Sequence, residues 1–315
     1  MRAVRLSGTG DPSVLRIDDV AAPRPPTGDR ILVRVAASSI NGTDLGLRRG
    51  VPGAAVFGRL VGLGFDIAGE VAAVGPAVTA FAPGDRVAAL LPHNGGGQAE
   101  EVVLRQGRAA LVPAGVDIVE AAGLPLAGLT ALQALFGRAG LGTRPSARVL
   151  VYGAAGGIGS FAVQLAALAG AHVTGTASAA KRDFVRGLGA DDVVDHEGAL
   201  DGRERWDVVL DTPGLLDPVQ VRPALAPDGV LVTTRVAAVG TARELALGAV
   251  RRGPRFAFVA TSARSQDLTR LLDLVRRGLL RVPVDRVVPL DQIAEAHRYA
   301  ESREVRGKVV VTISP

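Results

Sequence analysis

The sequence predicts an α/β protein in which a mostly β segment is followed by a doubly wound parallel sheet. Before about residue 115, short apolar strands alternate with turns such as Pro83-Gly84-Asp85. From about residue 120, helical and strand patterns alternate, which is typical of a parallel sheet covered on both faces. The apolar run that starts at Val149 enters a glycine-rich turn and leaves it as a helix.

The elements follow this division along the chain. The strands expected in the first part are Met1–Leu6, Arg30–Ala37, Ile67–Val74, Arg86–Leu90 and Ala99–Leu104. In the second part we expect helices near 120–137, 158–169, 179–188, 217–225 and 265–277, and strands near 147–152, 171–176, 191–194, 206–210, 229–234 and 256–260. A last helix near 291–301 and a strand at 308–313 are expected to return to the first domain. The predicted domains are therefore 1–118 with 288–315, and 119–287.

Composition excludes several classes of protein. The 315 residues are 48% hydrophobic and 21% charged, as in ordinary soluble proteins. No segment approaches the ~20 apolar residues of a membrane span, and the first residues, MRAVRL, read as a strand, so we expect a cytoplasmic protein without membrane contact. The absence of cysteine excludes disulfides, a thiolate nucleophile and Cys-ligated zinc. The four histidines are not at ligand spacing, so no metal is expected.

The charge balance is basic, with a formal charge of +5 and a pI of about 10.5. The arginines are spread through the chain, and Tyr152, Tyr299 and Trp206 are its only Tyr and Trp residues. Because no basic stripe with stacking aromatic residues occurs, we predict a solvated arginine-rich surface and no nucleic-acid partner.

The segment Val149–Gly159, VLVYGAAGGIG, carries the most specific signal. Strand, glycine turn and helix occur in the order that cradles a pyrophosphate, with glycines that admit a tight turn and a helix N-terminus that offers free N–H groups. The spacing fits G-x-G-x-x-G with alanine in the first place. The residues predicted to bind a dinucleotide here are Gly153, Ala154, Gly156, Gly157, Ile158 and Gly159. Tyr152, just before them, points either to the cofactor or into the core, and we expect the core.

The end of the next strand indicates which dinucleotide binds. An acidic residue about 20 positions after the glycines would hold the ribose of NAD, but the run from Thr174 reaches Asp183 before any carboxylate occurs. Thr176, Ser178 and Lys181 lie there instead, and a hydroxyl with a cation suits a 2′-phosphate. The alternative is that Lys181 belongs to a solvated helix face. We predict NADPH as the cofactor.

Several motifs occur together in an order that resembles the medium-chain dehydrogenase/reductase superfamily, over nearly the whole chain. They are GFDIAGEVAAVGPAV (Gly64–Val78), FAPGDRV (Phe81–Val87), GGQAEEVV (Gly96–Val103), LPLAGLTA (Leu124–Ala131), LGADDVVD (Leu188–Asp195) and GKVVV (Gly307–Val311). The resemblance implies a Rossmann domain with a mostly β, GroES-like domain. Because Phe65-Asp66 stands where zinc enzymes have His-Glu, the chain resembles the zinc-independent branch of quinone oxidoreductases and enoyl reductases. That branch implies NADPH, a quinone or enone substrate and a homodimer or tetramer, of which we expect the homodimer.

The resemblance also implies roles for single residues. Asn41 matches the asparagine near the nicotinamide and substrate, and Asp44 the aspartate that follows it. Thr130 matches the threonine near the nicotinamide, and Ser178 with Lys181 matches the phosphate-binding pair. His196 stands where the family often has a tyrosine beside the adenosine phosphate.

Catalysis without a metal requires donors for the oxygen that gains charge and a source of a proton. Asn41 is either that donor or a turn asparagine before Gly42. Asp44 either takes part in proton transfer or caps the helical turn Leu45–Arg49. His93 is either a proton donor or an exposed loop histidine.

The sequence thus predicts an NADPH-dependent, zinc-free oxidoreductase that reduces a quinone or an α,β-unsaturated carbonyl compound. One alternative is a biosynthetic enoyl or keto reductase that acts on a bulky polyketide-like substrate. Another is a redox-inactive sensor that binds NADPH. The homodimer is expected to form along Gly229–Thr234, taken as an edge strand that continues into the apolar run Val236–Val239.

Overall fold

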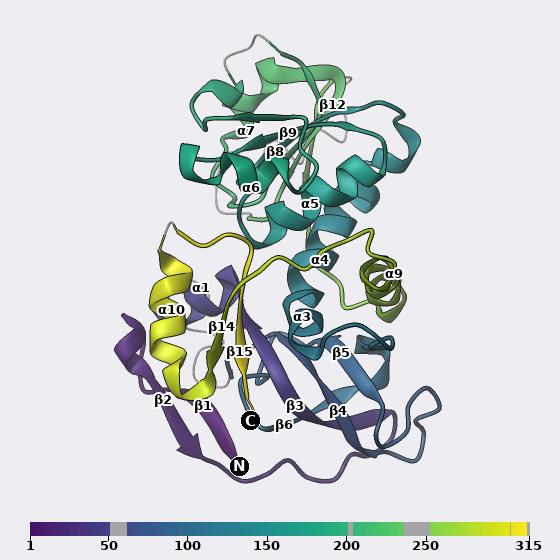
Figure 1. Cartoon of the computed structure of the whole chain (residues 1–315), viewed down its shortest axis with the longest axis vertical. Coiled ribbons are helices and arrows are strands. Elements are labelled where there is room, and N and C mark those ends of the chain that lie inside the picture. Colours follow the sequence, from purple (N-terminus) through teal and green to yellow (C-terminus); the bar gives the residue numbers. More distant parts are fainter. Residues whose placement is uncertain (51–61, 201–203, 236–252, 303, 314–315) are drawn as a thin grey trace. The chain divides into compact units, whose positions relative to one another are not determined.

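The computed structural model describes residues 1–50, 62–200, 204–235, 253–302 and 304–313 (Figure 1). The chain divides into two compact units, Met1–Leu129 with Ala263–Pro315 (unit 1) and Thr130–Ser262 (unit 2). Unit 1 is discontinuous, and the division falls at 129/130 and 262/263, whereas the sequence predicts boundaries at 118/119 and 287/288. Helix α9 (Ser265–Arg276) packs against a strand of unit 1. Local sequence patterns do not show such long-range packing, so the boundary could not be predicted from them.

Unit 1 is mostly β. Its main sheet has the order β14-β15-β3-β4-β5-β7, with β6 paired to β3, and a separate ribbon joins β1 to β2. The strands are β1 (Arg2–Leu6), β2 (Leu15–Asp19), β3 (Arg30–Ile40), β4 (Asp66–Val74), β5 (Arg86–Leu90), β6 (Glu101–Arg105), β7 (Ala109–Leu111), β14 (Val284–Pro289) and β15 (Lys308–Thr312). All pairs are antiparallel except β14 with β15. Strands β2, β7 and β14 were not predicted.

Strand β3 organises this sheet. Its residues Ile31, Val33, Val35 and Ala37 are fully buried at every second position, as expected of one face of a strand that packs on a core. After Ala37 the alternation stops, and the polar Ser38, Ser39 and Asn41 are buried as well. Buried polar side chains require partners, so the end of β3 marks a candidate site.

Helices complete unit 1. They are α1 (Gly42–Arg49), α3 (Ile118–Gly123), α4 (Pro125–Leu132, whose end enters unit 2), α9 and α10 (Ile293–Glu301), with 3₁₀ turns η1 (Pro12–Val14), η2 (Gln106–Arg108) and η8 (Leu290–Gln292). The prediction of one continuous helix near 120–137 is wrong. This segment consists of α3, α4 and the π-helix η3 (Gln133–Arg138). Pro125 lacks an N–H group and so interrupts the hydrogen bonding after α3.

Unit 2 is a six-stranded parallel sheet of order β10-β9-β8-β11-β12-β13. Its strands are β8 (Arg148–Tyr152), β9 (His172–Thr176), β10 (Asp192–Val194), β11 (Trp206–Asp211), β12 (Leu225–Thr233) and β13 (Arg255–Phe258). Its helices are α5 (Gly157–Leu168), α6 (Arg182–Arg186) and α7 (Pro218–Val221), with 3₁₀ turns η4 (Leu141–Thr143), η5 (Ala179–Lys181), η6 (Gly198–Leu200) and η7 (Arg222–Ala224). The doubly wound parallel sheet is confirmed.

The strand order of unit 2 reverses between β8 and β11. Ligands of such sheets bind beyond the carboxyl ends of the strands at this switch point. The same order corrects the dimer argument, because β12 pairs with both β11 and β13 and is not an edge strand. The expected continuation Val236–Val239 lies outside the described residues, so the homodimer stays a prediction.

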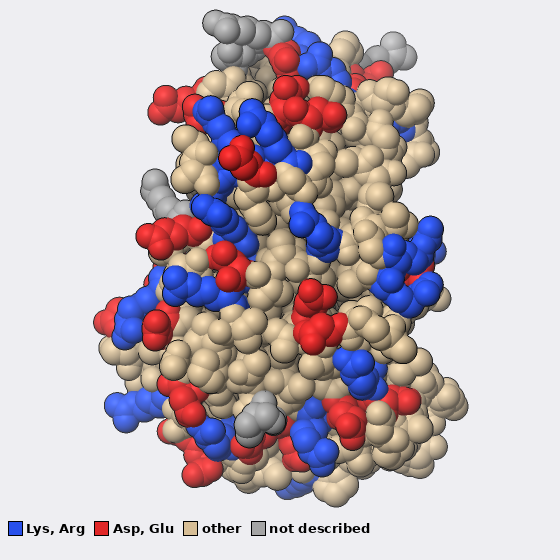
Figure 2. Space-filling model, viewed as in Figure 1, with Lys and Arg blue, Asp and Glu red and all other residues tan. Residues whose placement is uncertain are grey.

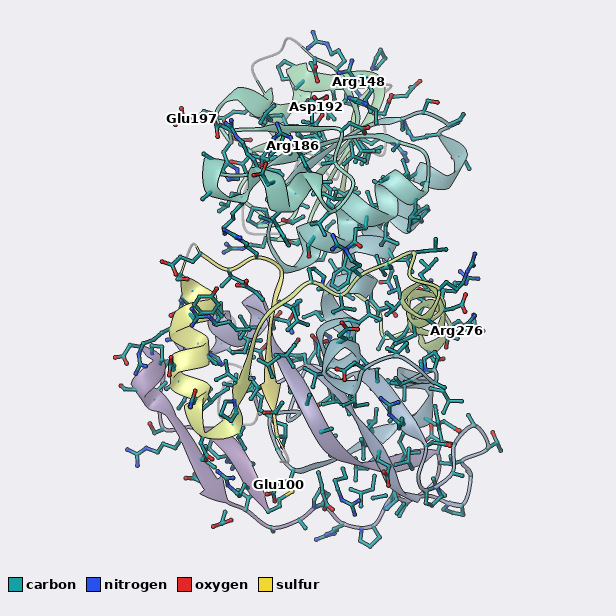
Figure 3. All side chains as sticks on the ribbon, in the orientation of Figure 1. Glu100, Arg148, Arg186, Asp192, Glu197 and Arg276 are labelled. Carbon is teal, nitrogen blue, oxygen red and sulfur yellow. The ribbon has the colours of Figure 1, made fainter. Side chains whose placement is uncertain are left out.

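The surface carries charges of both signs, interspersed over the face shown in Figure 2. Arg148, Arg186 and Arg276, labelled in Figure 3, each have an acidic neighbour: Glu204 at 2.8 Å, Asp183 at 3.5 Å and Asp273 at 2.6 Å. Such exposed pairs contribute little to stability, but they balance the basic composition locally. Across the described part of the chain, every helix is too short or too polar to cross a membrane.

Candidate functional site

The glycine turn of unit 2 lies between β8 and α5, beside the switch point. Gly153 has a φ of 81°, a left-handed conformation that favours glycine. Its N–H donates to the Thr176 hydroxyl at 2.9 Å, and the Ala154 N–H donates to the Thr176 carbonyl at 3.1 Å. Two hydrogen bonds therefore fix the turn to the end of β9.

The turn leads directly into α5, whose N-cap residue Gly156 provides no side-chain cap. A Cβ atom on Gly159 would lie 2.2 Å from the Gly153 carbonyl oxygen, so only glycine allows the helix to start this close to the turn. The first N–H groups of a helix lack intrahelical acceptors, and the helix dipole adds positive potential there. Gly157, Ile158 and Gly159 supply these groups, so the predicted residues fit a pyrophosphate.

The end of β9 is polar and carries no carboxylate. The buried Thr176 hydroxyl accepts from Gly153 and lies 2.9 Å from His196 Nδ1. The exposed His196 ring meets the Tyr152 ring edge-on, with centroids 5.0 Å apart. Tyr152 is half-buried, so its predicted core position is wrong. Ser178, which is exposed, and Lys181, which is half-buried, follow Thr176 in the sequence, at the two ends of the turn η5. These residues fit an anionic group on the ribose.

Asp211 holds the neighbouring loop at the switch point. Its buried carboxylate accepts N–H groups of Gly214, Leu215 and Leu216 at 2.9 to 3.1 Å. Burial raises the pKa of Asp211, and these N–H groups oppose that rise. A role for Asp211 was not predicted, although an aspartate that ends a buried strand before Thr-Pro-Gly is a detectable signal.

A buried polar cluster lies where β3, β4 and β15 meet in unit 1. We define it as Ser39, Asn41, Asp44, Asp66 and Lys308, which are all buried. The register explains it: Ser39 pairs with Asp66, and Ile40 pairs with Val309, the residue after Lys308. Helix α1 begins directly after Asn41, so Asp44 is one turn away.

Asp66 is the acceptor at the centre of this cluster. Its Oδ2 accepts the Ser39 hydroxyl at 2.5 Å and Asn41 Nδ2 at 2.8 Å, and it lies 3.5 Å from Lys308 Nζ. Its Oδ1 accepts the Leu126 N–H at 2.6 Å. Burial lowers the pKa of Lys308, and the nearby Asp66 and Asp44 carboxylates oppose that effect. Lys308 and Asp66 therefore form a buried ion pair whose two charges offset each other.

Asp44 has the geometry of a cap. Its Oδ2 accepts the Asn41 N–H at 2.9 Å, and its Oδ1 accepts the Gly64 N–H at 2.7 Å. Burial raises the pKa of Asp44 to about 7, against the effect of those two N–H donors. The helix starts at Gly42, three residues earlier than the predicted turn at Leu45.

The other two predicted residues lie apart from this cluster. His93 is exposed in the turn after β5, and its ring makes no hydrogen bond to any residue that the structure describes. Thr130 opens unit 2 and is buried, with its hydroxyl 2.6 Å from the Thr261 hydroxyl.

The glycine turn between β8 and α5 is that of a dinucleotide-binding domain, and relatives named NAD(P)H oxidoreductase indicate a nicotinamide cofactor. Two family models match the chain: an alcohol dehydrogenase GroES-like domain at residues 27–131 and a zinc-binding dehydrogenase at 188–311. The chain belongs to the medium-chain dehydrogenase/reductase family, as the sequence resemblance indicated.

Individual relatives agree over most of the chain. A chloroplast envelope quinone oxidoreductase homolog of Arabidopsis thaliana is 33% identical, covering 94% of this chain and 93% of its own length. An NADPH-dependent alkenal/one oxidoreductase of the same plant is 32% identical, covering 99% of this chain and 79% of the relative. The quinone oxidoreductase structure from Coxiella burnetii superposes with a TM-score of 0.91 at 30% identity, covering 100% of this chain and 99% of that one.

The matched description mentions zinc, but the side chains that the structure describes do not fit a zinc site. The chain has no cysteine, and no group of three His, Asp or Glu side chains within the described ranges is arranged to hold a metal. Both oxygens of Asp66 already accept hydrogen bonds, and its neighbour is the cation Lys308. No step of the reaction is therefore assigned to zinc.

Proposed function

We propose that the protein reduces quinones or α,β-unsaturated carbonyl compounds with NADPH. The observation that carries the proposal is the glycine turn joined through Thr176 to an end of β9 that is basic and free of carboxylates. A 2′-phosphate needs hydrogen-bond donors and positive charge, which Ser178, Lys181 and the free edge of His196 offer. The names of the relatives, quinone oxidoreductase and alkenal/one oxidoreductase, support the two classes of acceptor.

Bound NADPH supplies a hydride to an electron-poor carbon of the acceptor. The acceptor oxygen then gains negative charge, and a preorganised donor stabilises it. Asn41 is the proposed donor, because its amide is neutral and the structure gives it a defined orientation at the end of β3. Asp44 supports this arrangement by capping α1. Water or the exposed His93 supplies the proton.

Turnover tests the reaction. Loss of the reduced-nicotinamide absorbance is followed with a panel of quinones and enones, with NADPH and NADH in parallel. We expect oxidation of NADPH by at least one class, and a lower KM for NADPH than for NADH. Tight NADPH binding without turnover across the panel would instead favour the redox-inactive sensor.

The phosphate contact has its own test. Lys181→Ala removes the ammonium proposed to meet the 2′-phosphate, so NADPH affinity should fall about tenfold or more while NADH affinity changes little. Arg186→Ala removes an exposed cation of α6 that pairs with Asp183, and it serves as the matched control. Equal losses for both cofactors would remove Lys181 from the phosphate site.

A further inference from the structure

Lysine is rare in this chain. Of the 36 Lys and Arg residues only two are lysines, Lys181 and Lys308. Lys181 belongs to the proposed phosphate contact, whereas Lys308 is 2% exposed in β15 and lies within the buried polar cluster. A buried cation is costly unless it is paired, so Lys308 calls for a role that arginine, with its larger planar head, does not fill.

The contacts of Lys308 determine how the Asn41 amide is oriented. Lys308 Nζ lies 2.6 Å from Asn41 Oδ1, and Asn41 Nδ2 lies 2.8 Å from Asp66 Oδ2. An ammonium group only donates hydrogen bonds, and an ionised carboxylate only accepts them. A flipped amide would place its NH₂ against the ammonium and its oxygen against the carboxylate. The two charged groups therefore allow one orientation of Asn41.

This orientation leaves one donor of Asn41 available. Its Oδ1 faces Lys308, and one Nδ2–H is used by Asp66. The second Nδ2–H has no partner among the described residues, and Asn41 as a whole residue is 9% exposed. A cation on the amide oxygen polarises the amide and strengthens its N–H as a donor.

We propose that Lys308 is a positioning residue that, together with Asp66, locks and polarises the Asn41 amide so that its free Nδ2–H stabilises the acceptor oxygen as it gains charge. This inference rests on the proposed reduction of a quinone or enone. Lys308 touches neither substrate nor cofactor, and it acts through Asn41.

Kinetics of Lys308→Met test the inference. Methionine keeps the length of the side chain but removes the donor to Asn41. Removing a donor to an oxyanion lowers kcat about 10²-fold to 10³-fold. Lys308 acts through such a donor, so its removal should lower kcat by less, about tenfold to a hundredfold. The KM for NADPH should stay within about twofold of wild type. Lys181→Met should show the opposite pattern, with its larger effect on that KM, and Arg276→Met on α9 is a control for loss of an exposed cation.

Lys308→Met leaves the Asp66 carboxylate buried without its counter-charge, so this variant can fail to fold. The double variant Asp66→Asn with Lys308→Met removes both charges together and keeps the cluster neutral. It should fold and still lose kcat, because a neutral amide at position 66 accepts either orientation of Asn41. A wild-type kcat in either folded variant would overturn the inference.

An NMR measurement separates this inference from the proposed function. The chain contains two asparagines, Asn41 and Asn94, so protein labelled with ¹⁵N-asparagine gives two side-chain NH₂ pairs. We expect the Asn41 Nδ2–H that Asp66 accepts to exchange slowly with solvent in wild type and at least tenfold faster in the double variant, while the exposed Asn94 pair is unchanged. If no acceptor is reduced, the proposed function fails and this readout still decides the orientation. Equal exchange of that Asn41 Nδ2–H in both proteins would overturn the locking.

Discussion

Two buried titratable groups of unit 1 have pKa values that burial moves in opposite directions. Burial raises the pKa of Asp44 to about 7 from its ordinary value of 3.8. Burial, with the nearby Arg48 as a second cause, lowers the pKa of His297 to about 3 from 6.5. The His297 ring is fully buried, and neither of its nitrogens has a hydrogen-bond partner among the described residues.

The two shifts affect stability with opposite signs. Between about pH 4 and 7 the folded protein keeps the Asp44 proton and the unfolded chain does not. The unfolding free energy therefore falls as pH rises through this interval. Between about pH 6.5 and 3 the unfolded chain protonates His297 and the folded protein does not, so stability is lost as pH falls. Each slope is about 1.4 kcal/mol per pH unit, and the two cancel from about pH 4 to 6.5.

Because the two slopes cancel in wild type, variants that remove one of the two groups should show a pH dependence of the unfolding free energy relative to wild type. Relative to wild type, Asp44→Asn should gain about 3 kcal/mol of unfolding free energy as pH rises from about 4 to 6.5. His297→Leu should lose a similar amount over the same interval. Changes in packing or hydrogen bonding move each curve up or down without changing its slope. The double variant should run parallel to wild type.

Urea unfolding followed by circular dichroism measures these differences at several pH values. Subtracting the wild-type curve removes the contribution of the exposed carboxylates, which the variants share. The single tryptophan, Trp206, lies in unit 2, so its fluorescence reports that unit separately. A curve for Asp44→Asn that runs parallel to wild type would refute the reasoning about its buried carboxyl group.

Two further predictions concern unit 2. Gly159→Ala places a Cβ 2.2 Å from the Gly153 carbonyl oxygen, so NADPH affinity measured by calorimetry should fall about tenfold or more, whereas Gly198→Ala, with no atom within 4 Å, should bind normally. Unchanged affinity in Gly159→Ala would contradict the proposal that the glycine turn before α5 binds the pyrophosphate. Asp211→Ala removes the acceptor of three loop N–H groups, so hydrogen exchange of Gly214–Leu216 should accelerate about tenfold or more, and unchanged exchange would show that other contacts hold the loop.

Local signals predicted the architecture of unit 2. Strand and helix periods repeat there within short windows, and the glycine turn has a fixed spacing, so β8, α5 and β9 lie close to where they were expected. The break at Pro125, which divides one expected helix into α3 and α4, was detectable as well. The short strands β2 and β7 were not predicted, because strands with so few residues do not show a recognisable hydrophobic period.

The doubly wound sheet and the dinucleotide turn could be predicted from the sequence, because each depends on patterns within a few tens of residues, and the family could be predicted from the order of several such motifs along the chain. That Asn41, Asp66 and Lys308 form one cluster became visible in the folded protein alone. Their positions in the chain are far apart, and pairing of β3 with both β4 and β15 brings them together. Strand register depends on which strands pair and on the burial of one face, and no local window contains that information.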